Sequence, residues 1–224
     1  MILRIFGHDF HYECENLCRV YFPNEKINIV YDESGEDERT VITKCSPIDG
    51  GNLVSVDAEI DGVSRSAQAE VIAEDNELRD RSELKTAQLI FSLLSEITGY
   101  TPPWGVLTGV RPSKLMLRLI DQMGAEGAKR YFTEDLLVSE EKTMLAQTVA
   151  NAEEKIIALS DELSNIRAIY RDYNKLGDEL WNRFNQKDKK EHAWYYGSFI
   201  ETLAEYKGSA AYEEYCELVN KIFG

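Results

Sequence analysis

Several features that would place a protein in a known chemical class are scarce in this chain of 224 residues. No apolar run approaches the roughly 18 to 20 residues that a membrane-spanning helix needs, so we expect no membrane segment. Residues 1–6 lack the layout of a secretory signal peptide, and the four cysteines show no paired spacing, which is typical of reduced thiols in a cytoplasmic protein. Neither a Gly-x-Gly-x-x-Gly motif nor a P-loop occurs, which removes the common nucleotide-binding signatures.

Positive charge is also in short supply. The chain has 25 lysines and arginines against 40 aspartates and glutamates, so its formal net charge is −15. A phosphate backbone would be repelled by such a surface, and we therefore expect no general nucleic-acid binding. Any local group of cations stands out against this background.

One such group follows residues 103–114, Pro-Trp-Gly-Val-Leu-Thr-Gly-Val-Arg-Pro-Ser-Lys. The two glycines permit unusual backbone conformations, and Pro112 suits the first turn of a helix. Arg111, Lys114 and Arg118 would share one face of that helix, where cations near the N-terminus oppose the helix dipole. Two interpretations stay open. The segment is either a site for a carboxylate or phosphate, or a structural elbow with Trp104 buried and Arg111 paired to an acid.

The same run resembles the N-terminal region of the HemZ-type oxygen-independent coproporphyrinogen III dehydrogenases, a radical S-adenosylmethionine family. Further similar segments follow in the same order, and the resemblance covers about residues 1–157. They are Gly7-His8-Asp9-Phe10, Glu15-Asn16-Leu17-Cys18-Arg19 with Phe22-Pro23, Leu93-Leu94-Ser95-Glu96-Ile97-Thr98-Gly99, and Leu137-Val138-Ser139-Glu140-Glu141-Lys142.

The resemblance implies a role in haem biosynthesis, with S-adenosylmethionine and a [4Fe–4S] cluster held by Cys-x3-Cys-x2-Cys in a barrel that follows this region. Cys14 and Cys18 have the first spacing, but Tyr21 occupies the third position and the next cysteine is Cys45. We therefore expect no catalytic residue, metal site or cofactor in this chain, and no activity of the chain alone. The expected substrate-binding residues are Trp104, Thr108, Gly109, Arg111, Lys114 and Arg118, and the expected partners are a porphyrinogen-like polyanion or a radical S-adenosylmethionine barrel.

Periodicity predicts an α+β fold, with an N-terminal β-α-β meander domain and flanking helices in residues 1–138. The expected elements are a strand at 2–6, a helix from Phe10 to Tyr21, strands at 27–31, 40–45, 53–60 and 63–73, and a helix whose apolar stripe runs from Leu84 to Ile97 and is closed by Gly99. Asp61-Gly62 predicts a tight type I′ hairpin. The acidic segment 32–39 is expected to be a mobile loop.

Residues 139–224 are expected to be all helical. Apolar residues spaced alternately by four and three form a heptad seam from Leu145 to Phe184, followed by helices at about 191–206 and 210–223. Trp194, Tyr195 and Phe199 are expected to face inward on the first of these helices. The seam could pack inside a three-helix bundle, which we favour, or form an arm that dimerises or docks a partner.

Two functions from different classes therefore remain. One is an accessory domain that positions a polyanionic tetrapyrrole or seats the catalytic barrel. The other is a helical interaction or dimerisation protein with no tetrapyrrole role. The cluster of His8, His11, Cys14 and Cys18 could suggest a metal site, but one helix face supplies tetrahedral ligands poorly, so buried thiols are the favoured interpretation.

Overall fold

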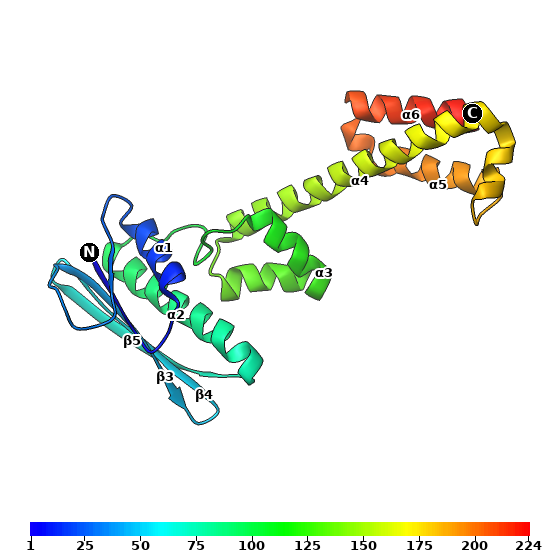
Figure 1. Cartoon of the computed structure of the whole chain (residues 1–224). Coiled ribbons are helices and arrows are strands. Elements are labelled where there is room, and N and C mark those ends of the chain that lie inside the picture. The colour runs from blue at the N-terminus through cyan, green and yellow to red at the C-terminus, as the bar shows by residue number, and fades with distance from the viewer. The chain divides into compact units, whose positions relative to one another are not determined.

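The computed structural model describes residues 1–224 and has the α+β organisation that the sequence predicts (Figure 1). The chain divides into two compact units, Met1–Thr148 and Val149–Gly224. A five-stranded sheet with helices forms the first unit, and the second is entirely helical. No helix combines the length and the apolar character that crossing a membrane requires.

The sheet of the N-terminal unit is mixed. Its strands are β1 (Ile2–Phe6), β2 (Asn28–Val30), β3 (Arg39–Ile48), β4 (Gly51–Ile60) and β5 (Val63–Ile72), in the order β2-β1-β3-β4-β5. β1 runs parallel to both of its neighbours, whereas β3, β4 and β5 form an antiparallel meander. Helix α1 (His11–Tyr21) connects β1 to β2, so the predicted β-α-β unit followed by a meander is confirmed.

Helices α1 and α2 (Asp75–Thr98) cover one face of this sheet (Figure 1). The buried positions alternate along the strands, as expected for a sheet with one packed face. They include Leu3, Ile5, Val41, Val54 and Val56. Near β1, residues 32–35 lie against the opposite face.

There the guanidinium of Arg4 donates hydrogen bonds to the carbonyls of Asp32, Ser34 and Gly35, at 2.6–3.0 Å. Residues 32–38 of the segment predicted as a loop have no regular structure, whereas Arg39 begins β3, and the segment is tied to the sheet by the Arg4 side chain. Its mobility stays a prediction.

Local turn chemistry is as predicted at two places. Asp61 and Gly62 have φ values of 51° and 82°, the positive values that a type I′ turn requires. Gly99 ends α2 in the left-handed conformation, with φ 67°, and its N–H donates to the carbonyl of Ser95.

The rest of the N-terminal unit is helical. Helix α3 (Pro112–Arg130) begins with proline in its first turn, as predicted, and is kinked at Gly124, where φ is 77°. A π-helical turn, η1 (Tyr131–Asp135), follows, and α4 (Glu140–Leu176) begins after it. The domain boundary that the sequence predicts after residue 138 lies just before α4, whereas the two compact units divide after Thr148, inside this helix.

The C-terminal unit contains most of α4, a 3₁₀ segment η2 (Gly177–Arg183), helix α5 (Lys189–Thr202), a 3₁₀ turn η3 (Ala204–Tyr206) and helix α6 (Ala210–Phe223). From Leu159 onward the heptad positions of α4 pack into one core with α5 and α6, and η2 contributes to it. For this part of the seam, the internal bundle is confirmed. The fully buried members include Ile166, Leu180, Leu203 and Tyr215.

Three predictions for this unit are wrong in detail. The heptad seam does not continue as one helix to Phe184, because α4 ends at Leu176 and Gly177 takes a φ of 55°. Val149 and Ile156 on the seam are exposed, since α5 and α6 have 14 residues each, or about 21 Å, and cannot cover all 37 residues of α4. Trp194 is 72% exposed and Tyr195 44%, because α5 buries Tyr196 instead, while Leu203 just beyond α5 is buried as predicted.

Candidate functional site

The inner half of the 103–114 segment is held by backbone contacts. It lies between α2 and α3, where the N–H of Val106 donates to the carbonyl of Leu136 at 2.9 Å and the N–H of Ser139 donates to that of Pro103 at 3.0 Å. We call these paired stretches, residues 103–106 and 136–139, the clasp. Gly105 has a φ of 59°, and a Cβ there would lie 2.0 Å from the Leu136 carbonyl oxygen. Only glycine permits this approach.

The outer half of the segment faces solvent. Gly109 has a φ of 70°, and a Cβ placed on it would lie 3.2 Å from the hydroxyl of Tyr12, a residue of α1. Tyr12 is 56% exposed and Val110 is 54% exposed. Sequence reasoning missed Tyr12. The available signal was an aromatic residue lying off the apolar stripe of its helix.

The six predicted site residues are distributed along this segment and the start of α3. Trp104 is half-buried, with the Lys142 ammonium 5.8 Å from its ring centroid, and Thr108 is also half-buried. Arg111 is the N-cap residue of α3, in an extended conformation. Lys114 and Arg118 are exposed, and no acid lies in the first turn of the helix. Whether these residues bind a ligand stays a prediction.

Arg118 also lines a groove of about 880 Å³ whose walls are α2, β5, α3 and η1. Two further cations line it. Arg81 is neutralised by Glu77, whose carboxylate is 2.8 Å away, whereas Lys85 is half-buried and, like Arg118, forms no ion pair. The structure thus places Arg118 in the same groove as Lys85, which lies 33 positions earlier and was not among the predicted site residues. Four carboxylates share the groove, namely Glu70, Glu77, Asp80 and Asp135.

The Gly7-His8-Asp9-Phe10 segment is a structural junction at the end of β1. A Cβ on Gly7 would lie 2.2 Å from the Cys45 carbonyl oxygen. His8 Nδ1 accepts from the N–H of Phe10, so Nε2 carries the proton and donates to Thr43 Oγ1 at 3.0 Å. Burial lowers the pKa of His8 below its ordinary value of 6.5. A neutral imidazole that forms a hydrogen bond through each ring nitrogen stabilises the turn here.

The cysteines of α1 do not fit an iron–sulfur cluster. Cys14 and Cys18 are buried against the core, and burial raises the pKa of both thiols, that of Cys18 to about 12. Tyr21, in the third position of the motif, forms a hydrogen bond with Ser95 Oγ at 2.7 Å. A cluster needs converging thiolates, whereas no three His, Cys, Asp or Glu side chains of the chain are placed to hold a metal ion.

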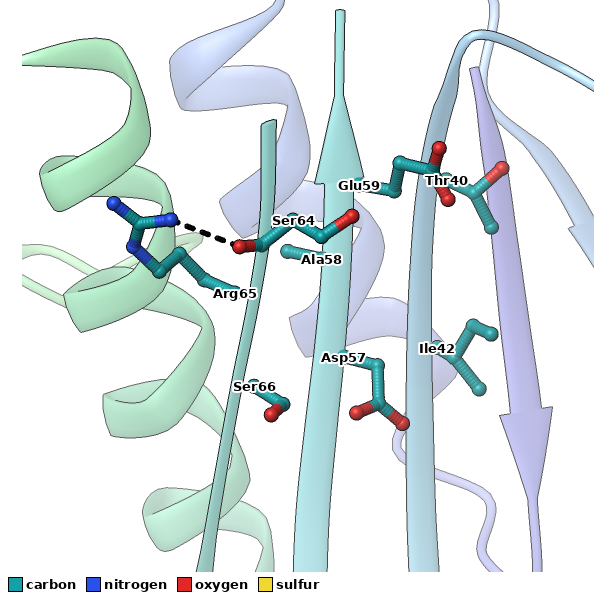
Figure 2. A pocket seen from close by; sticks show the side chains of 8 residues that line it. All are labelled: Thr40, Ile42, Asp57, Ala58, Glu59, Ser64, Arg65 and Ser66. Carbon is teal, nitrogen blue, oxygen red and sulfur yellow. Dashed lines mark hydrogen bonds between the residues drawn. The ribbon is translucent and has the colours of Figure 1, made fainter. Parts of the chain in front are cut away.

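The open face of the sheet carries a shallow hollow of about 510 Å³ (Figure 2). It is lined by the carboxylates of Asp57 and Glu59 and by the hydroxyls of Thr40, Ser64 and Ser66. Its one cation, Arg65, is engaged with Glu96 at 2.6 Å and with the carbonyl of Ser64. The hollow is therefore unsuited to an anionic ligand.

Comparison with known proteins gives one informative result. No family model matches the chain, and no solved structure matches it. The chain is similar to the oxygen-independent coproporphyrinogen-III oxidase-like protein HemZ of Bacillus subtilis (strain 168), with 26% identity over 160 residues. The match covers 67% of this chain and 31% of HemZ, so the chain spans about a third of the length of that relative. An identity of this size supports a distant relationship between the chain and HemZ.

Proposed function

We propose that this chain is an accessory part of a haem-biosynthetic enzyme of the coproporphyrinogen oxidase kind, where it positions a polyanionic tetrapyrrole or seats the catalytic barrel. The distant relationship to HemZ supports the enzyme class. The construction of the 103–114 segment supports the role, because its inner half is clasped by backbone contacts while its outer half is exposed beside cations.

The single observation that carries substrate positioning is the exposure of Lys114 and Arg118 on α3. Neither forms an ion pair, although the chain carries 15 more acidic than basic side chains. A propionate can accept a charge-assisted hydrogen bond from such a group, worth about 1.5–3 kcal/mol. Tyr12 and Val110 add exposed apolar surface close to the same segment. An amphiphilic polycarboxylate matches this combination of groups.

The test is a titration with coproporphyrin III, followed by absorbance at two salt concentrations. We expect weak, salt-sensitive binding that Lys114→Gln/Arg118→Gln weakens at least fivefold without loss of folding. The matched control is Lys187→Gln/Lys190→Gln, which removes the same charge from exposed positions of the C-terminal unit. Equal weakening by both double variants would show that net charge alone attracts the porphyrin.

The seating role has its own readout. Co-purification of the chain with the barrel part of B. subtilis HemZ, undisturbed by Lys114→Gln, would favour seating over substrate positioning. If neither porphyrin nor barrel binds, and Arg111→Ala lowers the melting temperature, the segment is a structural elbow and the proposed function is wrong.

The second candidate is a helical interaction protein with no tetrapyrrole role. Exposed apolar side chains on the C-terminal unit favour it, since Trp194 is 72% exposed, Ile156 51% and Ile157 59%. Large apolar side chains that stay exposed on a folded unit can take part in binding another protein. Sedimentation velocity tests this candidate directly. A wild-type dimer that Ile156→Glu/Ile157→Glu dissociates without unfolding would favour it, and a monomer at all concentrations would count against dimerisation.

A further inference from the structure

The outer edge of β5 offers backbone groups that no other strand uses. β5 pairs with β4 alone and is the last strand of the sheet, whereas the other edge strand, β2, has only three residues. β5 has ten residues and contains neither proline nor a bulge, two features that commonly block an edge strand. An edge of this kind can accept another strand.

The hairpin register identifies the backbone groups that point outward. In a two-residue hairpin the residues flanking the turn, here Ile60 and Val63, form a hydrogen-bonded pair, and bonded and non-bonded pairs then alternate. The outward N–H and C=O groups are therefore those of the even-numbered residues, namely Ser64, Ser66, Gln68, Glu70 and Ile72.

Arg65 closes the hairpin end of this edge. Its guanidinium donates to the outward carbonyl of Ser64 at 2.9 Å, as Figure 2 shows, and is anchored by Glu96 on α2. No hydrogen bond of this kind reaches the outward groups of Ser66, Gln68, Glu70 or Ile72. The open edge thus spans residues 66–72, with four residues whose backbone groups point outward, and it runs to the C-terminal end of the strand.

At that end the edge enters the groove of about 880 Å³, which Glu70, Val71 and Ile72 line from β5. Exposed apolar side chains stand on both sides of it, with Ile72 59% exposed and Met123 of α3 46% exposed. Leu84 and Leu119 also line the groove.

The charges of the groove are of both signs. Lys85 and Arg118 have no ion-pair partner, and the same holds for the carboxylates of Glu70 and Asp135. A small polyanion would meet two uncompensated acids here. A polypeptide can carry acidic, basic and apolar side chains in alternation while its backbone pairs with the strand. Because α3 and η1 wall the groove, the space suits one strand rather than a second sheet.

We infer that the open end of β5 binds one extended polypeptide segment as a sixth strand of the sheet. Resting on the function proposed above, this segment belongs to the catalytic part of the enzyme and carries apolar residues flanked by both charge signs. The groove then serves to hold that part against the accessory unit. Arg118 faces the bound segment, whereas Lys114, which does not line the groove, remains available for substrate.

The probe is an array of overlapping ten-residue peptides that covers the whole sequence of B. subtilis HemZ. We expect at least one peptide to bind and to slow hydrogen exchange at the amides of Gln68, Glu70 and Ile72. Gln68→Pro removes an outward N–H without breaking a bond to β4, so it should abolish binding. Ile72→Lys should weaken binding at least tenfold, while Val63→Lys, beyond Arg65 at the hairpin end, should leave it unchanged.

Circular dichroism of each variant verifies that the sheet is intact, and only variants with an unchanged spectrum are compared. The inference is overturned if no peptide binds, or if a bound peptide protects other amides and still binds Gln68→Pro. A wild-type dimer that Gln68→Pro converts to a monomer would assign the edge to a second copy instead. If a peptide binds but coproporphyrin III does not, the binding groove on β5 is supported and substrate positioning is rejected. If coproporphyrin III binds but no peptide does, substrate positioning is supported and the binding groove on β5 is rejected.

Discussion

Among single residues, His8 should make the stability of the N-terminal unit depend on pH. Burial lowers its pKa below 6.5, and protonation at Nδ1 would break the hydrogen bond from the N–H of Phe10. Between the two pKa values the unfolded chain binds more protons than the folded one, so the stabilisation is present above about pH 6.5 and is lost as the pH falls. We expect a lower urea midpoint at pH 5.5 than at pH 7.5.

His8→Gln is the matched control, since its amide can still donate to Thr43 Oγ1. The difference in midpoint between wild type and His8→Gln should change over this pH range. A difference that stays constant with pH would contradict the assignment of a neutral, buried imidazole.

The four thiols should differ in reactivity. Cys14, Cys18 and Cys45 are buried and burial raises the pKa of each, whereas Cys216 is partly exposed. Because the thiolate is the reactive species, Ellman's reagent at pH 8 should modify Cys216 first and the other three only on unfolding. Cys216→Ser should remove the fast phase. A fast phase that persists in this variant would show that the α1 thiols are accessible.

Among the structural elements, two glycines with positive φ should respond differently to the same substitution. At Gly62 a Cβ meets no atom within 4 Å, so Gly62→Ala should cost about 1–2 kcal/mol from the backbone conformation alone. At Gly105 a Cβ would lie 2.0 Å from the Leu136 carbonyl oxygen, which should add about 1–3 kcal/mol. Chemical denaturation of the two variants measures the difference. Equal losses would mean that the clasp is not closely packed.

For the molecule as a whole, Leu163→Asp distinguishes an internal bundle from a dimerising arm. Leu163 is 6% exposed in the core of α4, α5 and α6, so an aspartate there would bury an unpaired charge. We expect a loss of at least about 3 kcal/mol in the C-terminal unit, measured by the fluorescence of buried Trp181. Ile157→Asp, at an exposed position of the same helix, should change stability by less than about 0.5 kcal/mol. A wild-type dimer that Leu163→Asp turns into a folded monomer would contradict the internal bundle.

Sequence alone determined the features that depend on neighbours along the chain. The hairpin at Asp61-Gly62, the end of α2 at Gly99 and the first turn of α3 at Pro112 follow from backbone conformations that few residues permit. The buried part of the α4 seam follows from heptad spacing. The three turns and caps rest on interactions within a few residues, and the seam rests on a short repeat, so a linear pattern records all of them.

Tertiary packing decided the rest. It placed Arg118 in a groove with Lys85, brought Tyr12 beside Gly109, left Val149 and Ile156 uncovered, and kept the outer edge of β5 unpaired. None of these relations has a period or a fixed separation in the sequence. They depend on how far one element reaches past another and on which faces meet, and these distances are set only when the helices and the sheet pack together.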